Sequence, residues 1–153
     1  MTIETNSRRD FLVAGAALAA ATLAAAPKTA EAQAQGGRVT AHVLDLYSGT
    51  PANGIRIDLL AIDGGATKVL KSVVSNADGR PPEGPLLTPD TIKTGKYQAV
   101  LHVGDYYKKI GAKLPSGYHT KLILEFDVYD AKQPHHLPFQ ITPWTQSASV
   151  LPG

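Results

Sequence analysis

The fold of this chain is decided at residues 38–46, which read Arg-Val-Thr-Ala-His-Val-Leu-Asp-Leu. Apolar and polar residues alternate in this stretch, with Val39, Ala41 and Val43 against Thr40 and His42. Side chains along a β-strand change faces at every residue. The stretch therefore predicts a half-buried strand that packs its apolar side on a core and presents His42 on the opposite side.

Two later segments place a second histidine and an arginine beside strand-like stretches. Residues 134–138 read Pro-His-His-Leu-Pro, and the alternation that continues to Ile141 puts His136 opposite the apolar face. Residues 75–80 read Ser-Asn-Ala-Asp-Gly-Arg and predict a turn that ends in Arg80. Two imidazoles and one guanidinium on the outside of a rigid β-scaffold are typical of a site for a small anionic or carbonyl-rich ligand.

Beyond residue 37 the chain has an all-β pattern. Strands are predicted at 38–46, 55–62, 69–74, 97–103, 121–128, 136–142 and, as a last short strand, 147–151. Residues 105–111 predict a helical turn or short helix, and residues 81–95, with four prolines, predict a loop. Seven or eight short strands with Gly, Pro and Asn between them favour a single β-sandwich domain.

The first 32 residues predict an export signal. Paired arginines at 8 and 9 precede Asp-Phe-Leu and a small-residue apolar run at 13–26. That run is shorter than the roughly 20 residues a membrane-spanning helix needs. The paired arginines are typical of a twin-arginine address, and Ala30-Glu31-Ala32 offers a cleavage site, with Ala26 as the alternative. A soluble amphipathic helix is the other interpretation, but the run has almost no polar face.

We therefore expect a signal peptide at 1–32, a linker at 33–37 and a β-sandwich at 38–153. The location expected from this signal is the periplasm, with no membrane association after cleavage.

Composition excludes several classes of site. The chain has no Cys, so disulfides and thiolate-bound zinc are excluded. Its 15 basic and 13 acidic side chains give a formal net charge of +2 without a basic stripe, so nucleic acid is not an expected partner. The sequence contains no Gly-x-Ser-x-Gly nucleophile elbow. We expect neither a metal nor any other cofactor.

Four short motifs occur in a fixed order along the predicted sandwich. They are His-Val-Leu-Asp with Gly-x-Pro-Ala at 42–52, Asn-Ala-Asp-Gly-Arg at 76–80, Gly-x-Tyr at 95–97, and His-x-Pro with Thr-Pro-Trp at 136–144. In these motifs the chain resembles the transthyretin-like hydroxyisourate hydrolases. The resemblance implies a transthyretin-like β-sandwich of seven or eight strands with one short helix. It also implies a homotetramer whose active sites lie in the channel between two dimers.

The resemblance implies catalytic roles for His42, Arg80 and His136. The implied substrate is hydroxyisourate, a cyclic ureide of urate degradation that is opened by attack of water on a ring carbonyl. One imidazole takes a proton from the water, and Arg80 offsets charge on the carbonyl oxygen. The second imidazole orients the water or protonates the departing nitrogen.

The C-terminal end departs from the family pattern. The family ends in Tyr-Arg-Gly-Ser, where residues 149–152 read Ser-Val-Leu-Pro, and its His-Tyr-His segment reads Pro-His-His at 134–136. The tail is closer to that of the hormone-binding transthyretins, although those carriers do not keep the His, Arg and His. Two alternatives to a hydrolase stay open: a non-catalytic carrier of small ligands, and an accessory sandwich domain that binds another protein.

Three other side chains have a structural interpretation. His102 and His119 are predicted to be surface or satisfied residues, and Trp144 is predicted to be a packing or subunit-interface aromatic.

Overall fold

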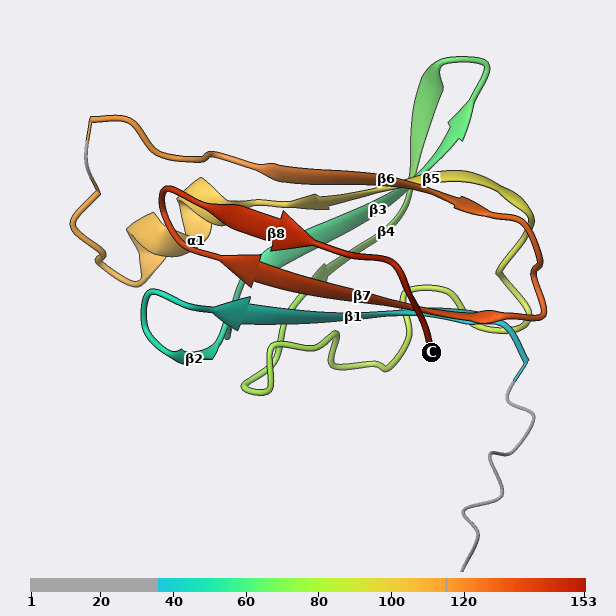
Figure 1. Ribbon diagram of the computed structural model, residues 1–153, viewed down its shortest axis with the longest axis horizontal. Helices are drawn as coiled ribbons and strands as arrows, with labels where there is room; N and C mark the ends of the chain where they lie inside the picture. The colour runs from blue at the N-terminus through green and yellow to red at the C-terminus, as the bar shows by residue number, and fades with distance from the viewer. Residues whose placement is uncertain (1–35, 115) are drawn as a thin grey trace, which may run out of the picture. The chain divides into compact units, whose positions relative to one another are not determined.

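Two β-sheets and one helix form the part of the chain that the computed structural model describes, residues 36–114 and 116–153 (Figure 1). The predicted signal peptide and most of the predicted linker lie outside these residues. The elements are β1 (Arg38–Asp45), β2 (Thr50–Pro51), β3 (Arg56–Asp63), β4 (Ala66–Val74), β5 (Gly95–Leu101), α1 (Val103–Lys109), β6 (Leu122–Val128), β7 (Pro134–Ile141), β8 (Gln146–Ala148) and β9 (Leu151–Pro152).

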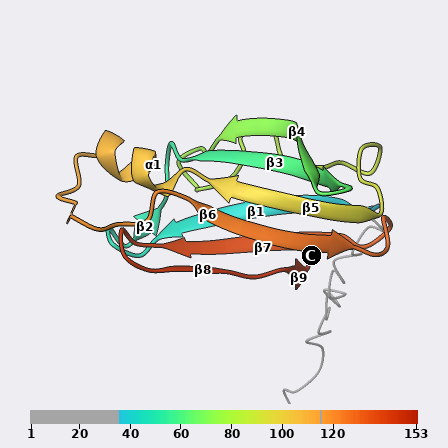
Figure 2. The same cartoon turned by 90° about the horizontal axis from the view of Figure 1, so that it is seen from above.

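The two sheets lie as two layers (Figure 2). The first has the order β2-β1-β7-β8, with β9 also paired to β7, and the second has the order β4-β3-β5-β6. β1 and β7 run parallel, and the other paired strands are antiparallel. The predicted all-β sandwich with one short helix is confirmed. The described residues contain nine strands, more than the predicted seven or eight, because this number includes β2 and β9, which are only two residues long.

The apolar faces of the two sheets meet in one core. The predicted alternation in β1 is confirmed, since burial alternates along its whole length. Val39, Ala41 and Val43 are 0–1% exposed. Fully buried residues of β3 and β7, such as Ile57, Leu59, Phe139 and Ile141, belong to the same cluster. Removal of this apolar surface from water is the main force that joins the layers.

The predicted strands 69–74 and 147–151 differ most from the structure, and both differences have local reasons. β4 begins at Ala66 because Gly64 and Gly65, both with positive φ, form a two-residue turn that pairs Asp63 with Ala66 directly. The predicted strand 147–151 is split into β8 and β9. The break lies opposite Pro138 of β7, which has no N–H to donate and only accepts a bond from the Ser149 N–H, at 3.2 Å.

The predicted helix also begins earlier than expected, at Val103. The described residues contain no helix that is long and apolar enough to cross a membrane.

A buried carboxylate ties α1 to the end of β1. Asp45 is 1% exposed and accepts hydrogen bonds from the hydroxyls of Tyr107 at 2.5 Å, Ser48 at 2.7 Å and Tyr106 at 3.2 Å. It also accepts the Tyr47 N–H at 2.9 Å. Burial, reinforced by Asp45, raises the pKa of both helix tyrosines, so their hydroxyls stay protonated donors. The carboxylate is stable in the core only because these donors surround it.

Replacing Tyr107 by Phe is expected to lower the free energy of unfolding by about 1–3 kcal/mol, because it removes one of the few donors that compensate the buried Asp45 carboxylate. Urea denaturation followed by circular dichroism measures the change. Tyr129→Phe is the matched control, since Tyr129 is 86% exposed and its loss of a hydroxyl should change stability by less than about 0.5 kcal/mol. Equal effects of the two substitutions would contradict this account of Asp45.

Candidate functional site

The outward face of the first sheet carries both predicted site histidines. In the parallel pairing of β1 with β7, Thr40 lies opposite His136 and His42 lies opposite Pro138. His42 is therefore displaced by two residues along the sheet from His136. With strands about 4.8 Å apart and a rise of about 3.3 Å per residue, the Cα atoms of the two histidines lie about 8 Å apart. That separation leaves room for a water molecule or a small ligand between the imidazoles.

Arg80 reaches this face from the turn at 75–80. Its Nη2 atom lies 3.4 Å from Nδ1 of His42. The turn is held by the side-chain oxygen of Asn76, which accepts the backbone N–H groups of Asp78 and Arg80, both at 3.0 Å. The structure thus brings together all three predicted site residues, from three segments that are far apart in the sequence.

The turn also lies directly against β1. The Val43 N–H donates to the Gly79 carbonyl at 2.8 Å. Gly79 has φ of 70°, and a Cβ atom at this position would stand 2.2 Å from the Val43 carbonyl oxygen. Only glycine permits this approach. Because Arg80 follows Gly79 and His42 precedes Val43, the same contact sets the guanidinium beside the imidazole.

The electrostatics of the site favour neutral histidines. Burial lowers the pKa of His42, and the positive charge of Arg80 lowers it further. Burial likewise lowers the pKa of His136, with added contributions from Arg80 and His42. A neutral imidazole has a free lone pair that accepts a proton from water. The site therefore combines two bases with one fixed cation.

The C-terminal segment adds a third side chain beside Thr40 and His136 on the outward face of the first sheet. β9 pairs with β7 so that Leu151 lies opposite His136, on the side away from Thr40. Leu151 is 46% exposed. The stretch in which the tail departs from the family pattern thus lies at the site itself, and it gives His136 an apolar neighbour.

A cavity of about 450 Å³ opens beside the site. Thr40 and Arg80 line it together with three prolines of the loop after the turn, Pro81, Pro85 and Pro89. A small ligand held by the Arg80 guanidinium has an apolar wall available on one side.

Two residues of the site were not among the predicted site residues. Thr40 Oγ1 lies 2.9 Å from Nδ1 of His136, and Leu151 flanks the same ring from β9. The alternation along β1 already placed Thr40 on the same face as His42. It could not show which strand lies next to β1 or in which register.

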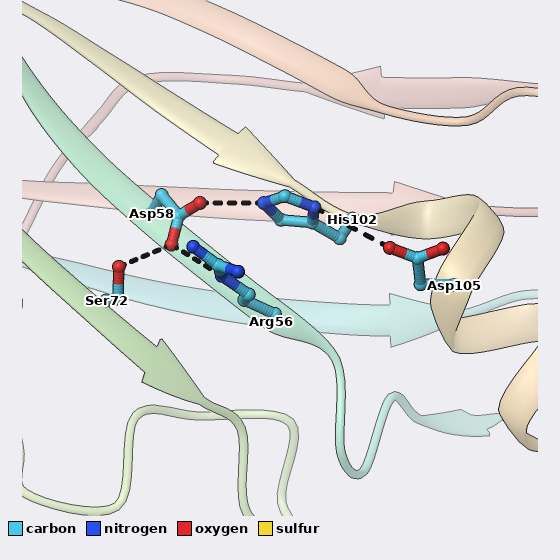
Figure 3. A network of polar contacts seen from close by, with 5 residues as sticks. All are labelled: Arg56, Asp58, Ser72, His102 and Asp105. Atoms are coloured by element: carbon cyan, nitrogen blue, oxygen red, sulfur yellow. Dashed lines mark hydrogen bonds and ion pairs between the residues drawn. The ribbon is translucent and has the colours of Figure 1, made fainter. Parts of the chain in front are cut away.

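The remaining predicted structural residues are satisfied elsewhere, as expected. Nε2 of His119 lies 2.7 Å from the Trp144 carbonyl oxygen. The Trp144 ring packs edge-to-face on Tyr47, with ring centroids 5.8 Å apart. His102 stands before α1 and belongs to a polar network on the second sheet (Figure 3).

Asp58 is the centre of that network. It accepts Ser72 Oγ at 2.6 Å and Arg56 Nε at 2.9 Å, and its second oxygen lies 2.7 Å from His102 Nε2 (Figure 3). Burial alone would raise the pKa of Asp58, but these hydrogen bonds and the Arg56 charge lower it to about 2. The network ties β3, β4 and the start of α1 together. Within residues 36–114 and 116–153, no group of three or more His, Asp and Glu side chains is arranged to hold a metal ion.

Comparison with known proteins gives the family of this chain. The family model described as "HIUase/Transthyretin family" matches residues 39–148. The chain is 40% identical over 112 residues to 5-hydroxyisourate hydrolase 2 of Rhizobium meliloti (strain 1021), covering 72% of this chain and 92% of that protein.

Two solved structures are similar to the described sandwich. The first is the 5-hydroxyisourate hydrolase of Klebsiella pneumoniae, with a TM-score of 0.61, 26% identity and coverage of 75% of this chain and 99% of that one. The second is sea bream transthyretin in complex with thyroxine, with a TM-score of 0.68, 18% identity and coverage of 76% and 96%. At 18% identity, the similarity to sea bream transthyretin shows only that the two proteins share a fold.

Replacing Arg80 by Gln is expected to raise the pKa of both His42 and His136, because the cation that disfavours their protonated forms is removed. NMR titration of the imidazole signals measures this change. Arg56→Gln, on the second sheet, is the control and should leave both pKa values as they are. Unchanged or lowered values in the Arg80 variant would show that the guanidinium does not act on these rings.

Proposed function

The chain belongs to the HIUase/Transthyretin family, and on this premise we propose that it hydrolyses 5-hydroxyisourate, opening a ring amide of this cyclic ureide in urate degradation. The observation that carries the proposal is the placement of Arg80 against His42, with His136 on the same open face. The similarity to the Rhizobium meliloti protein, which extends over 92% of that protein, supports it.

His136 is assigned as the general base. It removes a proton from a water molecule while the water oxygen forms a bond to the ring carbonyl carbon. The lowered pKa of His136 keeps the imidazole neutral near pH 7, as a base requires. General-base assistance of this kind is worth about 10²–10⁴-fold in rate.

Arg80 is assigned to the substrate oxygens. Negative charge develops on the carbonyl oxygen as water adds, and a fixed guanidinium in a partly desolvated site stabilises it. The planar, forked donor set of arginine also matches the adjacent carbonyl oxygens of a cyclic ureide. When the tetrahedral intermediate collapses, the ring C–N bond breaks and the departing nitrogen takes up the proton that His136 removed from the water. His42, beside Arg80, is assigned to relaying that proton to the nitrogen or to orienting the water.

A non-catalytic carrier of small ligands is the second candidate. Leu151 beside His136 and the proline wall beside Arg80 favour it, because both present apolar surface to a ligand. Binding of urate-like or aromatic ligands without turnover would select this function over hydrolysis.

We also propose a homotetramer with the sites in a channel between dimers, as the family resemblance implies. Large apolar side chains remain exposed near one end of the first sheet, among them Leu46 at 55%, Tyr47 at 47% and Trp144 at 49%, which supports a covered surface. Light scattering of the protein without its predicted signal peptide is expected to give four times the subunit mass. A monomer at micromolar concentration would contradict this assembly.

The periplasm is the proposed location, because paired arginines at 8 and 9 precede an apolar run of small residues, a pattern typical of a twin-arginine export signal. Cell fractionation of the chain with both arginines replaced by lysine tests it, since that variant should remain in the cytoplasm.

The catalytic assignments predict a ranked set of losses in kcat/KM, measured with hydroxyisourate generated in situ by urate oxidase. His136→Ala should lower kcat/KM by about 10²–10⁴-fold through loss of the base. Arg80→Lys should lower it by roughly 10²-fold, because a point charge cannot make paired planar contacts. His119→Ala is the matched control and should stay within about twofold. If His136→Ala and Arg80→Lys also stay within about twofold of wild type, His136 and Arg80 are not part of a catalytic site.

A further inference from the structure

Thr40 is the side chain that contacts the proposed base from the neighbouring strand. Its Oγ1 atom lies 2.9 Å from Nδ1 of His136 and 3.4 Å from the backbone carbonyl oxygen of His135. Among the described residues, it is the only side-chain hydrogen-bond partner of His136. Leu151, on the opposite flank of the ring, offers an apolar side chain and no hydrogen-bonding group.

The chemistry of a hydroxyl restricts how these two contacts are made. A threonine hydroxyl donates one proton and accepts at its lone pairs, whereas a carbonyl oxygen only accepts. The contact with the His135 carbonyl therefore uses the threonine proton. The contact with Nδ1 of His136 is then made by a ring N–H that donates to Oγ1. This arrangement satisfies both contacts at once, while turning the hydroxyl toward Nδ1 would satisfy only one.

We infer that Thr40 is a positioning residue that holds His136 in the tautomer protonated at Nδ1, so that Nε2 keeps the lone pair. The hydrogen bond at one ring nitrogen sets the protonation of the other. Its catalytic consequence rests on the proposed function: Nε2 is the atom that takes the proton from water. The strand register makes the contact rigid, because Thr40 and His136 are directly paired residues of two hydrogen-bonded strands.

The tautomer is tested first, by a measurement that does not depend on activity. In protein with ¹⁵N-labelled histidine, NMR of the His136 ring should show a protonated Nδ1 and an unprotonated Nε2 at neutral pH. Thr40→Val keeps the shape of the side chain and removes the hydroxyl, so the preference for protonated Nδ1 should be lost. Thr40→Ser should retain it. Thr67→Val, at an exposed position of β4, is the matched control and should leave the His136 signals unchanged.

Kinetics then test the consequence. Thr40→Val is expected to lower kcat by roughly 10- to 100-fold, as losing the partner that orients a functional imidazole does, with KM changed by less than about threefold. Thr40→Ser should restore kcat to within about threefold of wild type. A purely structural role of Thr40 would not separate kcat from KM or be rescued by serine alone.

Several outcomes would overturn the inference. These are a wild-type His136 protonated at Nε2, an unchanged tautomer in Thr40→Val, or a kcat of that variant equal to wild type. If Thr40→Val does not fold, the wild-type ring signals and the serine variant decide the question. Absence of hydrolysis in wild type, together with the Nδ1 proton and its loss in Thr40→Val, would overturn the proposed function and leave the tautomer assignment supported.

Discussion

The parallel pairing of β1 with β7 is the interaction on which the rest of the structure depends. Its register places Val43 beside Phe139 on the inner face and Thr40 beside His136 on the outer face. The inner face supplies the core, and the outer face supplies the site. A shift of one residue in this register would turn every side chain of one strand to the wrong side. Core stability and site geometry are therefore consequences of one ladder of backbone hydrogen bonds.

The edge of β1 that faces away from β7 is as important as the edge that pairs with β7. There the turn at 75–80 lies against the backbone of Val43, and glycine at position 79 allows the close approach. Because Arg80 follows directly, a contact between backbones determines where the guanidinium lies. The long side chain needs little further restraint to reach His42. Burial lowers the pKa of both histidines, and the further lowering by the Arg80 charge thus depends on the glycine that precedes this arginine.

The polar groups outside the site have a different role. Asp45 is surrounded by hydroxyl donors from α1 and the turn after β1, and Asp58 is surrounded by Ser72, Arg56 and His102. Each carboxylate joins elements that the apolar core alone would hold less specifically. In the site, by contrast, His42 and His136 have few partners and face an open surface, and that difference distinguishes structural polar groups from those available for chemistry.

The sequence by itself determined the strands of the sandwich, the outward direction of His42 and His136, and the turn that carries Arg80. These features follow from local rules: alternation along a strand, and the turn chemistry of Asn, Asp and Gly. Only the tertiary structure decided that β7 lies beside β1, that Thr40 contacts His136, and that β8 and β9 separate opposite Pro138. It also placed the Tyr106 and Tyr107 hydroxyls on Asp45. Such contacts join residues about 60 to 100 positions apart, as between Thr40 and His136 or Asp45 and Tyr107. They depend on how the apolar faces pack together, which local periodicity does not encode.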